Sequence, residues 1–269
     1  MRALRLLVLA FIAVLASCVG TTGSGLVTFR LFVSGPRDVD ATRPFEFDSG
    51  RGYHVTLTRA TLHVGAVFLN RSVPIAGAQA TSCVLPGIYV GQVVPPSGGL
   101  GLDVDALSPI PQQFPALGSG TADHAEAGEV WLTGGPVDAA DDPTVILDVA
   151  GTAVRGGDTF RFEGKLTIGN NRLTDRGSSA QPGAHPICKQ RIATPIRTNL
   201  TPRDGGDLLL EIDPRGWFGN VDFSALAPSS DDPSLYVFVD DEAGDAASRN
   251  LFRALHAFDG VYRFSFRDR

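Results

Sequence analysis

Five histidines are the side chains whose chemistry first suggests a functional site: His54, His63, His124, His185 and His256. Imidazole nitrogens bind copper and zinc well, so two histidines brought together in space would form a transition-metal site. His54 and His63 belong to a stretch that we expect to be extended, which separates them by about 30 Å. One metal therefore cannot use both. We expect five unrelated histidines and no cofactor; the alternative is a transition-metal site, for which His63 and His124 are the candidate ligands.

Carboxylates form a second group with possible chemistry. Asp240, Asp241, Glu242 and Asp245 lie close in sequence, as do Asp103 and Asp105. Oxygen clusters of this kind can bind calcium, but the spacing of an EF-hand is absent. The first group precedes a predicted helix, where negative charge is favourable by itself. We therefore expect helix capping and solvation rather than a metal site.

Sequence motifs of known reactions are missing. The chain contains no Gly-x-Ser-x-Gly elbow, no His-Glu-x-x-His zinc motif and no phosphate-binding loop ending in Gly-Lys. The two tryptophans, Trp131 and Trp217, are expected to pack in the core or at an edge. The sequence therefore favours a protein that is not an enzyme, with an enzyme of unrecognised class as an alternative.

The first 18 residues carry the most specific signal. Arg2 and Arg5 precede an apolar run from Leu6 to Ala16. Such a start is typical of a secretory signal peptide, and a run of about 11 residues is shorter than the ~20 that a membrane-spanning helix needs. Leu15-Ala16-Ser17-Cys18 follows and resembles the lipobox of bacterial lipoproteins. The alternative is an ordinary signal peptide with a cysteine at its cleavage site by chance.

The lipobox resemblance implies how the chain is processed. Residues 1–17 would be the cleaved signal peptide, and Cys18 would carry acyl chains such as palmitate on its sulfur and its amino group. Three acyl chains hold a protein stably on a membrane. Val19 rather than aspartate follows Cys18, a pattern typical of the outer membrane in enterobacterial lipoproteins. Residues 18–25 are rich in glycine and predict a flexible tether, so the folded domain should comprise residues 26–269.

Cys83 and Cys188 are the two cysteines that remain if Cys18 bears lipid. An even pair in an exported protein favours a disulfide. Closing a loop of this length would stabilise the fold by about 4–5 kcal/mol. Metal ligation and two free thiols are the alternatives. Neither cysteine has a second one two residues away, which argues against zinc.

Composition limits the remaining choices. About 240 residues follow the tether, which suits one large all-β domain or two small ones. The hydrophobic share of 43% permits a sizeable core, and the net charge of −6 comes without any basic block. Nucleic-acid binding normally needs a clustered basic face, so nucleic acid is excluded as a partner.

Short strands dominate the expected secondary structure. We expect them at 26–33, 87–94, 128–133, 144–150, 159–168, 207–212, 235–239 and 261–266. The longest strand-forming stretch is 53–69. Its apolar alternation changes phase near Arg59 and Ala60, which predicts a bulge or bend and leaves both His54 and His63 facing away from the core.

Helix is scarce in the expected structure. A C-terminal helix is predicted at 246–258, with Asp245 as its N-cap and Gly260 at its end. A short helical turn after Asp213 carries Trp217 and Phe218. The segment 98–120 is rich in glycine and proline and is expected to be a long surface loop. We predict an all-β fold, an immunoglobulin-like antiparallel β-sandwich with one short C-terminal helix.

One further resemblance concerns the domain. Its opening strand VTFRLFV (27–33), the stretch GRGYHVTLTRATLHVGAVFL (50–69), LLLEID (208–213) with its Trp-Phe, and the closing helix and strand look like the layout of MbnP-like proteins. These are copper-associated periplasmic or surface β-sandwich proteins encoded beside di-haem peroxidase-like partners. The resemblance implies copper held by histidines and, in some members, an oxidised tryptophan.

The sequence thus predicts an exported lipoprotein with a non-enzymatic binding or scaffold role. Its partners would be a membrane, through the lipid, and an unknown protein or small molecule. A periplasmic or surface copper-handling protein is the main alternative.

Overall fold

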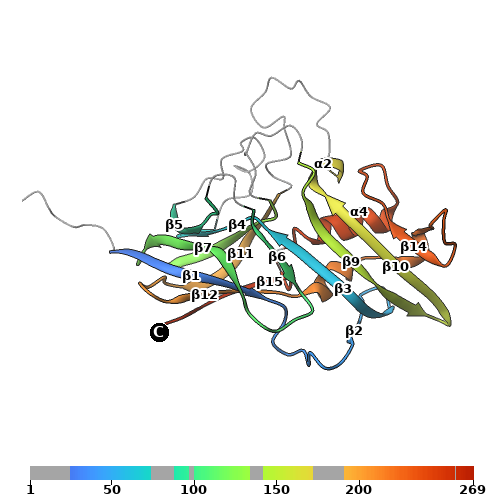
Figure 1. Cartoon of the computed structure of the whole chain (residues 1–269), viewed down its shortest axis with the longest axis horizontal. Helices are drawn as coiled ribbons and strands as arrows, with labels where there is room; N and C mark the ends of the chain where they lie inside the picture. Colours follow the sequence, from blue (N-terminus) through green and yellow to red (C-terminus); the bar gives the residue numbers. More distant parts are fainter. Residues whose placement is uncertain (1–24, 74–87, 97–99, 134–141, 172–190, 258) are drawn as a thin grey trace, which may run out of the picture.

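The computed structural model describes residues 25–73, 88–96, 100–133, 142–171, 191–257 and 259–269. Within these residues, fifteen strands form two sheets that occupy opposite ends of the long axis of the molecule (Figure 1). The strands of the eight-stranded sheet are, in spatial order, β11 (Ile192–Leu200), β8 (Ala125–Trp131), β4 (Ala66–Asn70), β5 (Tyr89–Val93), β7 (Gln112–Thr121), β1 (Leu26–Ser34), β12 (Asp207–Ile212) and β15 (Tyr262–Arg267).

The eight-stranded sheet is nearly closed and barrel-like, because its edge strands β11 and β15 contact each other. Phe264 of β15 lies directly against Gly128 of β8, where an added Cβ would come within 2.2 Å of the phenyl ring. Any side chain at position 128 would therefore push the two sides of the sheet apart.

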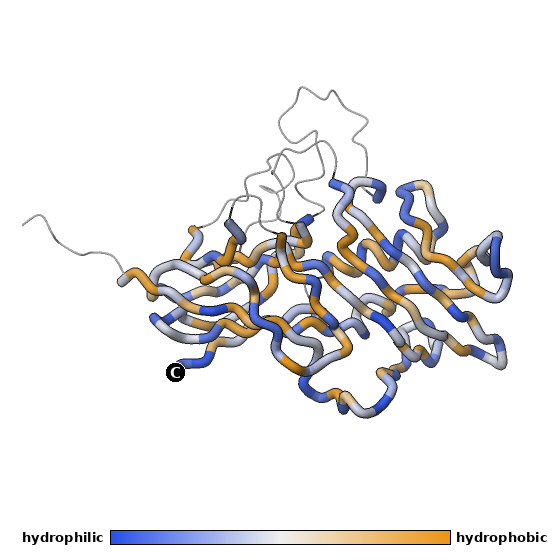
Figure 2. The backbone as a smooth tube through the Cα atoms, viewed as in Figure 1, coloured by the Kyte–Doolittle hydropathy of each residue, from blue (hydrophilic) through white to orange (hydrophobic). Residues whose placement is uncertain are grey.

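The other sheet has seven strands. In spatial order they are β13 (Ala227–Pro228), β14 (Leu235–Phe238), β10 (Asp158–Thr167), β9 (Val145–Arg155), β3 (His54–Val64) and β2 (Phe45–Asp48), with β6 (Leu102–Asp105) also paired to β3. Apolar and polar residues alternate along the long strands β9 and β10 (Figure 2). This alternation places one face of the sheet in the core.

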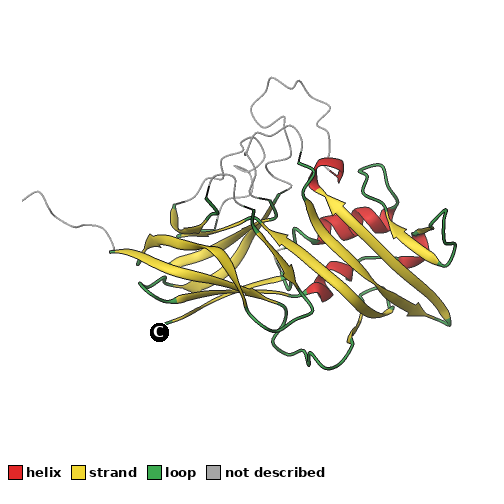
Figure 3. Ribbon diagram, in the orientation of Figure 1, coloured by secondary structure: helices red, strands yellow, loops and turns green. Residues whose placement is uncertain are grey.

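Few helices accompany the sheets. They are α2 (Ile168–Asn171), the 3-10 turns η2 (Pro214–Phe218) and η3 (Phe223–Ala225), and α4 (Ala246–Ala254), and they lie beside the seven-stranded sheet (Figure 3). Four phenylalanine rings pack where these turns meet the sheet: Phe162, Phe218, Phe223 and Phe238. Among the described residues, no helix combines the length and the apolar character needed to span a membrane.

The all-β prediction is confirmed, while the immunoglobulin-like sandwich is not. Strands β1 and β12 run parallel, as do β10 and β14, so the purely antiparallel arrangement was wrong for these two pairs. The predicted C-terminal helix is present as α4, with Asp245 accepting a hydrogen bond from the amide of Ser248, but it ends at Ala254 and not at the expected 258 before Gly260. The predicted turn after Asp213 is η2.

The predicted change of phase in the longest strand-forming stretch is confirmed. The pairing of β3 with β9 shifts register between Leu57 and Arg59, as a bulge does. The chain then crosses from the seven-stranded to the eight-stranded sheet at Gly65, whose amide donates to the carbonyl of Trp131 at 2.7 Å. The stretch 53–69 is therefore divided between β3 and β4.

The expected surface loop at 98–120 was wrong, because its described part contains β6 and most of β7. Strand β7 lies between β5 and β1. An added Cβ would approach the Phe29 ring to 2.3 Å at Gly118, and the Val90 carbonyl oxygen to 2.2 Å at Gly120. The glycines that suggested a loop thus allow close packing within a sheet. Strands β2 and β11 were also not expected.

Candidate functional site

Several residues predicted to carry chemistry lie outside the described part of the chain. These are Cys18, Cys83, Cys188 and His185. Lipidation of Cys18 and the disulfide between Cys83 and Cys188 therefore stay predictions.

His63 is buried, although it lies on the predicted face of β3, opposite the core residues Leu62 and Val64. It lies in β3 opposite Asp103 of β6, and its Nδ1 is 2.6 Å from the Asp103 Oδ1. Leu62, His63 and Val64 are all buried, because β6 pairs beside β3 just where the chain crosses between the sheets. Burial at His63 therefore does not mark a side chain that points into the core.

His63 and His124 are not joined by any interaction in the described residues. His63 belongs to the seven-stranded sheet, whereas His124 is exposed in the turn between β7 and β8. His54 is exposed, as expected, with its Nδ1 3.0 Å from Asp48. The described ranges contain no group of three or more histidine, cysteine or carboxylate side chains placed to hold a metal.

The acidic cluster before α4 serves mainly as a set of caps. Asp245 caps the helix, and Asp240 accepts hydrogen bonds from the backbone amide and hydroxyl of Thr167 and from Asn170. Asp105 accepts from the amide of Leu107 in the turn that follows β6. The expectation of helix capping is confirmed for Asp245, whereas Asp240 and Asp105 hold other turns of the chain.

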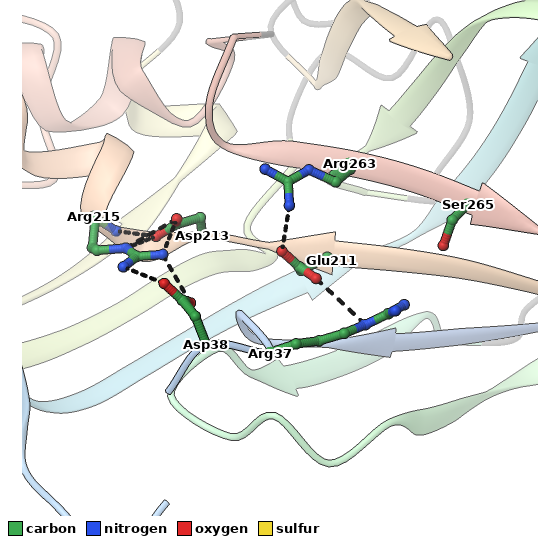
Figure 4. Close-up of a pocket in the computed structure, with 7 residues that line it drawn as sticks. All are labelled: Arg37, Asp38, Glu211, Asp213, Arg215, Arg263 and Ser265. Atoms are coloured by element: carbon green, nitrogen blue, oxygen red, sulfur yellow. Dashed lines mark hydrogen bonds and ion pairs between the residues drawn. The ribbon is translucent and has the colours of Figure 1, made fainter. Parts of the chain in front are cut away.

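A charged pocket that sequence reasoning missed lies beside β12 and β15 (Figure 4). Its volume is about 400 Å³. Strands β12 and β15, the turn η2 and the segment after β1 supply its lining, which consists of Arg37, Asp38, Glu211, Asp213, Arg215, Arg263 and Ser265. Residues 37–38 meet residues 211–215 because β1 and β12 pair in parallel, and the antiparallel pairing of β12 with β15 adds residues 263 and 265.

One half of the pocket is held by Arg215. Its guanidinium group contacts Asp213 at 2.7 Å and Asp38 at 3.0 Å. The hydrogen bond from Arg215 lowers the pKa of the Asp38 carboxyl, and the two carboxylates raise the pKa of Arg215. Two carboxylates around one guanidinium leave this half with one excess negative charge.

The other half has the opposite balance. Arg37 and Arg263 share the single carboxylate of Glu211, at 3.5 Å and 3.3 Å. Glu211 is largely buried, whereas the side chains of Arg37 and Arg263 are 54% and 77% exposed. Two guanidiniums around one carboxylate leave one excess positive charge in this half of the pocket.

A buried carboxylate, Glu129 of β8, is a second feature that the sequence did not reveal. It is fully buried and accepts hydrogen bonds from Asn70 and Trp131. The sequence feature that could have revealed this site is the segment GEVW (128–131). In an extended strand, Glu129 and Trp131 lie two residues apart and therefore on the same face. Trp131 is half-buried and Trp217 is fully buried, so the expectation of core or edge packing is confirmed for both.

Comparison with known proteins adds no assignment. No family model matches the chain, and neither curated proteins nor solved structures gave a significant match. The MbnP-like resemblance therefore stays a prediction.

Proposed function

We propose that the protein is an exported lipoprotein, anchored through Cys18, whose domain binds a partner rather than catalysing a reaction. Residues 1–17 are the signal peptide, 18–25 the lipidated cysteine and tether, and 26–269 the binding domain. The outer membrane is the proposed location. The observation that carries the binding role is the positive half of the charged pocket.

The pocket suits an anionic group of the partner, such as a carboxylate or phosphate. Arg37 and Arg263 each use one long contact to Glu211 and keep further donors free in a fork geometry that matches such oxygens. The hydroxyl of Ser265 lies on the same strand as Arg263 and also lines the pocket (Figure 4). The half of the pocket around Arg215 has an excess negative charge and repels an anion. An anionic group is therefore restricted to the half that contains Arg37 and Arg263.

Calorimetric titration of the mature lipoprotein in detergent micelles tests this binding. Acetate, phosphate and citrate are the probes. We expect saturable binding that weakens at least tenfold in the double variant Arg37→Gln/Arg263→Gln and weakens as salt increases. Arg203→Gln is the matched control, because Arg203 is equally exposed and pairs with Asp268 away from the pocket. Binding that the double variant leaves unchanged, or no binding of any probe, overturns the proposal.

Anchoring has a separate test. Globomycin, which blocks the peptidase that cleaves lipoprotein signals, should leave the precursor uncut. A Cys18→Ala protein should leave the membrane fraction. A variant that stays tightly membrane-bound would contradict the lipid anchor.

Copper handling is the second candidate, and one observation favours it. The contact of His63 Nδ1 with Asp103 leaves Nε2 as the ligating atom, an arrangement in which a carboxylate orients a metal-binding imidazole. Protein purified from an exporting host should then carry about one copper, lost in His63→Ala but kept in the His54→Ala control. Protein without copper after titration would reject this candidate.

A further inference from the structure

The outer side of strands β4, β5 and β8 contains a buried carboxylate that has no cationic partner among the described residues. Glu129 accepts hydrogen bonds from the Asn70 amide at 2.7 Å, from the Trp131 indole N–H at 3.2 Å and from the Tyr89 hydroxyl. All three donors are neutral, and Glu129 forms no ion pair with a Lys, Arg or His of the described residues. A buried carboxylate is normally paired with a cation or protonated.

Asn70 adds an independent sign of a missing group. Its side chain is fully buried, and its Oδ1 has no hydrogen-bond partner. Because Oδ1 and Nδ2 belong to one amide and Nδ2 binds Glu129, the unpartnered oxygen lies beside the carboxylate. A buried polar atom left unpaired costs about 1–3 kcal/mol. Glu129 and Asn70 therefore offer two neighbouring acceptors to a donor that has to come from outside.

Three aromatic rings surround these acceptors. Phe68 is directly opposite Glu129 in the pairing of β4 with β8, and its ring centroid is 4.9 Å from that of Trp131 and 5.1 Å from that of Tyr89. Tyr89 is 40% exposed and forms the outer wall of the cluster. Aromatic rings stabilise a nearby cation and cover the alkyl chain attached to it.

We propose that Glu129, Asn70 and the three rings form a binding site for a primary alkylammonium group. The ammonium donates to the Glu129 carboxylate and to Asn70 Oδ1, and its alkyl stem packs against Phe68, Trp131 and Tyr89. This site lies on different strands from the charged pocket and is independent of the binding proposed there.

Calorimetry on the mature full-length protein tests the site, with n-butylammonium as the probe. We expect saturable binding that weakens at least tenfold in Glu129→Gln, which keeps the shape of the side chain and removes its charge. Tetramethylammonium has the charge but no N–H donor and should bind at least tenfold more weakly than n-butylammonium. Glu126→Gln is the matched control, because Glu126 is an exposed carboxylate on the same strand. Its affinity should equal that of the wild type.

A third probe, Nα-acetyl-lysine amide, distinguishes two sources of the ammonium. Tighter binding than n-butylammonium identifies a lysine of a polypeptide, and weaker binding identifies a free amine. The proposal is overturned if n-butylammonium shows no saturable binding. That result is what we would expect if a water molecule, and not an ammonium group, donates to Asn70 Oδ1. It is also overturned if a Glu129→Gln protein with a normal thermal unfolding transition binds n-butylammonium as tightly as the wild type does. Binding of tetramethylammonium as tight as that of n-butylammonium would overturn it as well.

Discussion

Glu129 should make the stability of the protein depend on pH in a direction opposite to that of most carboxylates. Burial raises the pKa of Glu129 above its ordinary value of 4.5, although the hydrogen bonds from Trp131, Asn70 and Tyr89 oppose this shift. Between 4.5 and the raised pKa, the folded protein holds a proton that the unfolded chain releases. The contribution of Glu129 to the free energy of unfolding is therefore fully present below pH 4.5 and falls as pH rises through this window, by up to about 1.4 kcal/mol per pH unit.

Glu129→Gln isolates this effect. The amide cannot titrate, so the variant should lose this part of the pH dependence and gain stability relative to the wild type as pH rises. One of the two N–H donors that face the carboxylate will meet the new NH2 group, which costs about 1–3 kcal/mol at every pH. The quantity to follow is therefore the difference in unfolding free energy between the wild type and Glu129→Gln. The prediction concerns how this difference changes with pH and not its size at any one pH.

Urea denaturation followed by tryptophan fluorescence between pH 4 and pH 9 measures this difference. Glu126→Gln is again the control and should leave the pH dependence as in the wild type, since Glu126 is exposed. A constant difference between the wild type and Glu129→Gln over the whole range would refute the reasoning. It would mean that Glu129 titrates like an ordinary glutamate or is paired with a cation.

Three stability predictions concern the fold that positions these sites, each measured as a change in the urea midpoint. Gly118→Ala should destabilise the fold by about 1–3 kcal/mol, because the new Cβ would meet the Phe29 ring at 2.3 Å. Gly25→Ala is the control and should have little effect, because no atom lies within 4 Å of the new Cβ. Equal effects of the two substitutions would contradict the packing argument. Asp245→Ala should cost about 1 kcal/mol through loss of the α4 N-cap, and an unchanged midpoint would exclude a capping role. Phe218→Ala should cost about 3–5 kcal/mol by leaving a cavity among the buried rings, and a loss below 1 kcal/mol would show that the cluster collapses to fill it.

Local patterns in the sequence were sufficient for most strands and for the helix. Strand β12 has the predicted bounds, 207–212, and the bulge in β3 lies next to the predicted change of phase. Asp245 caps α4 as expected. These features depend on side-chain alternation and on hydrogen bonds between near neighbours, both of which are visible in a short stretch of chain.

The central strand β7 could not be predicted in the same way. Its glycines resemble a loop, yet Gly118 and Gly120 are required by the Phe29 ring and the Val90 carbonyl of neighbouring strands. The reason for a glycine at these positions lies on strands far away in the chain. His63 shows the same limit, since β6 covers it only after β3 and β6 have paired.

The sequence by itself determined the all-β class, most strand positions, the helix cap and the predictions that rest on Cys18, because each depends on adjacent residues. Only the tertiary structure decided that the eight-stranded sheet nearly closes, that Arg37 and Arg263 share Glu211, and that Asn70 meets Glu129. These pairs are brought together by strand register, which depends on the packing of the whole core. A carboxylate in a strand has the same letter whether it is exposed like Glu126 or buried like Glu129, and only the neighbouring strands decide its chemistry.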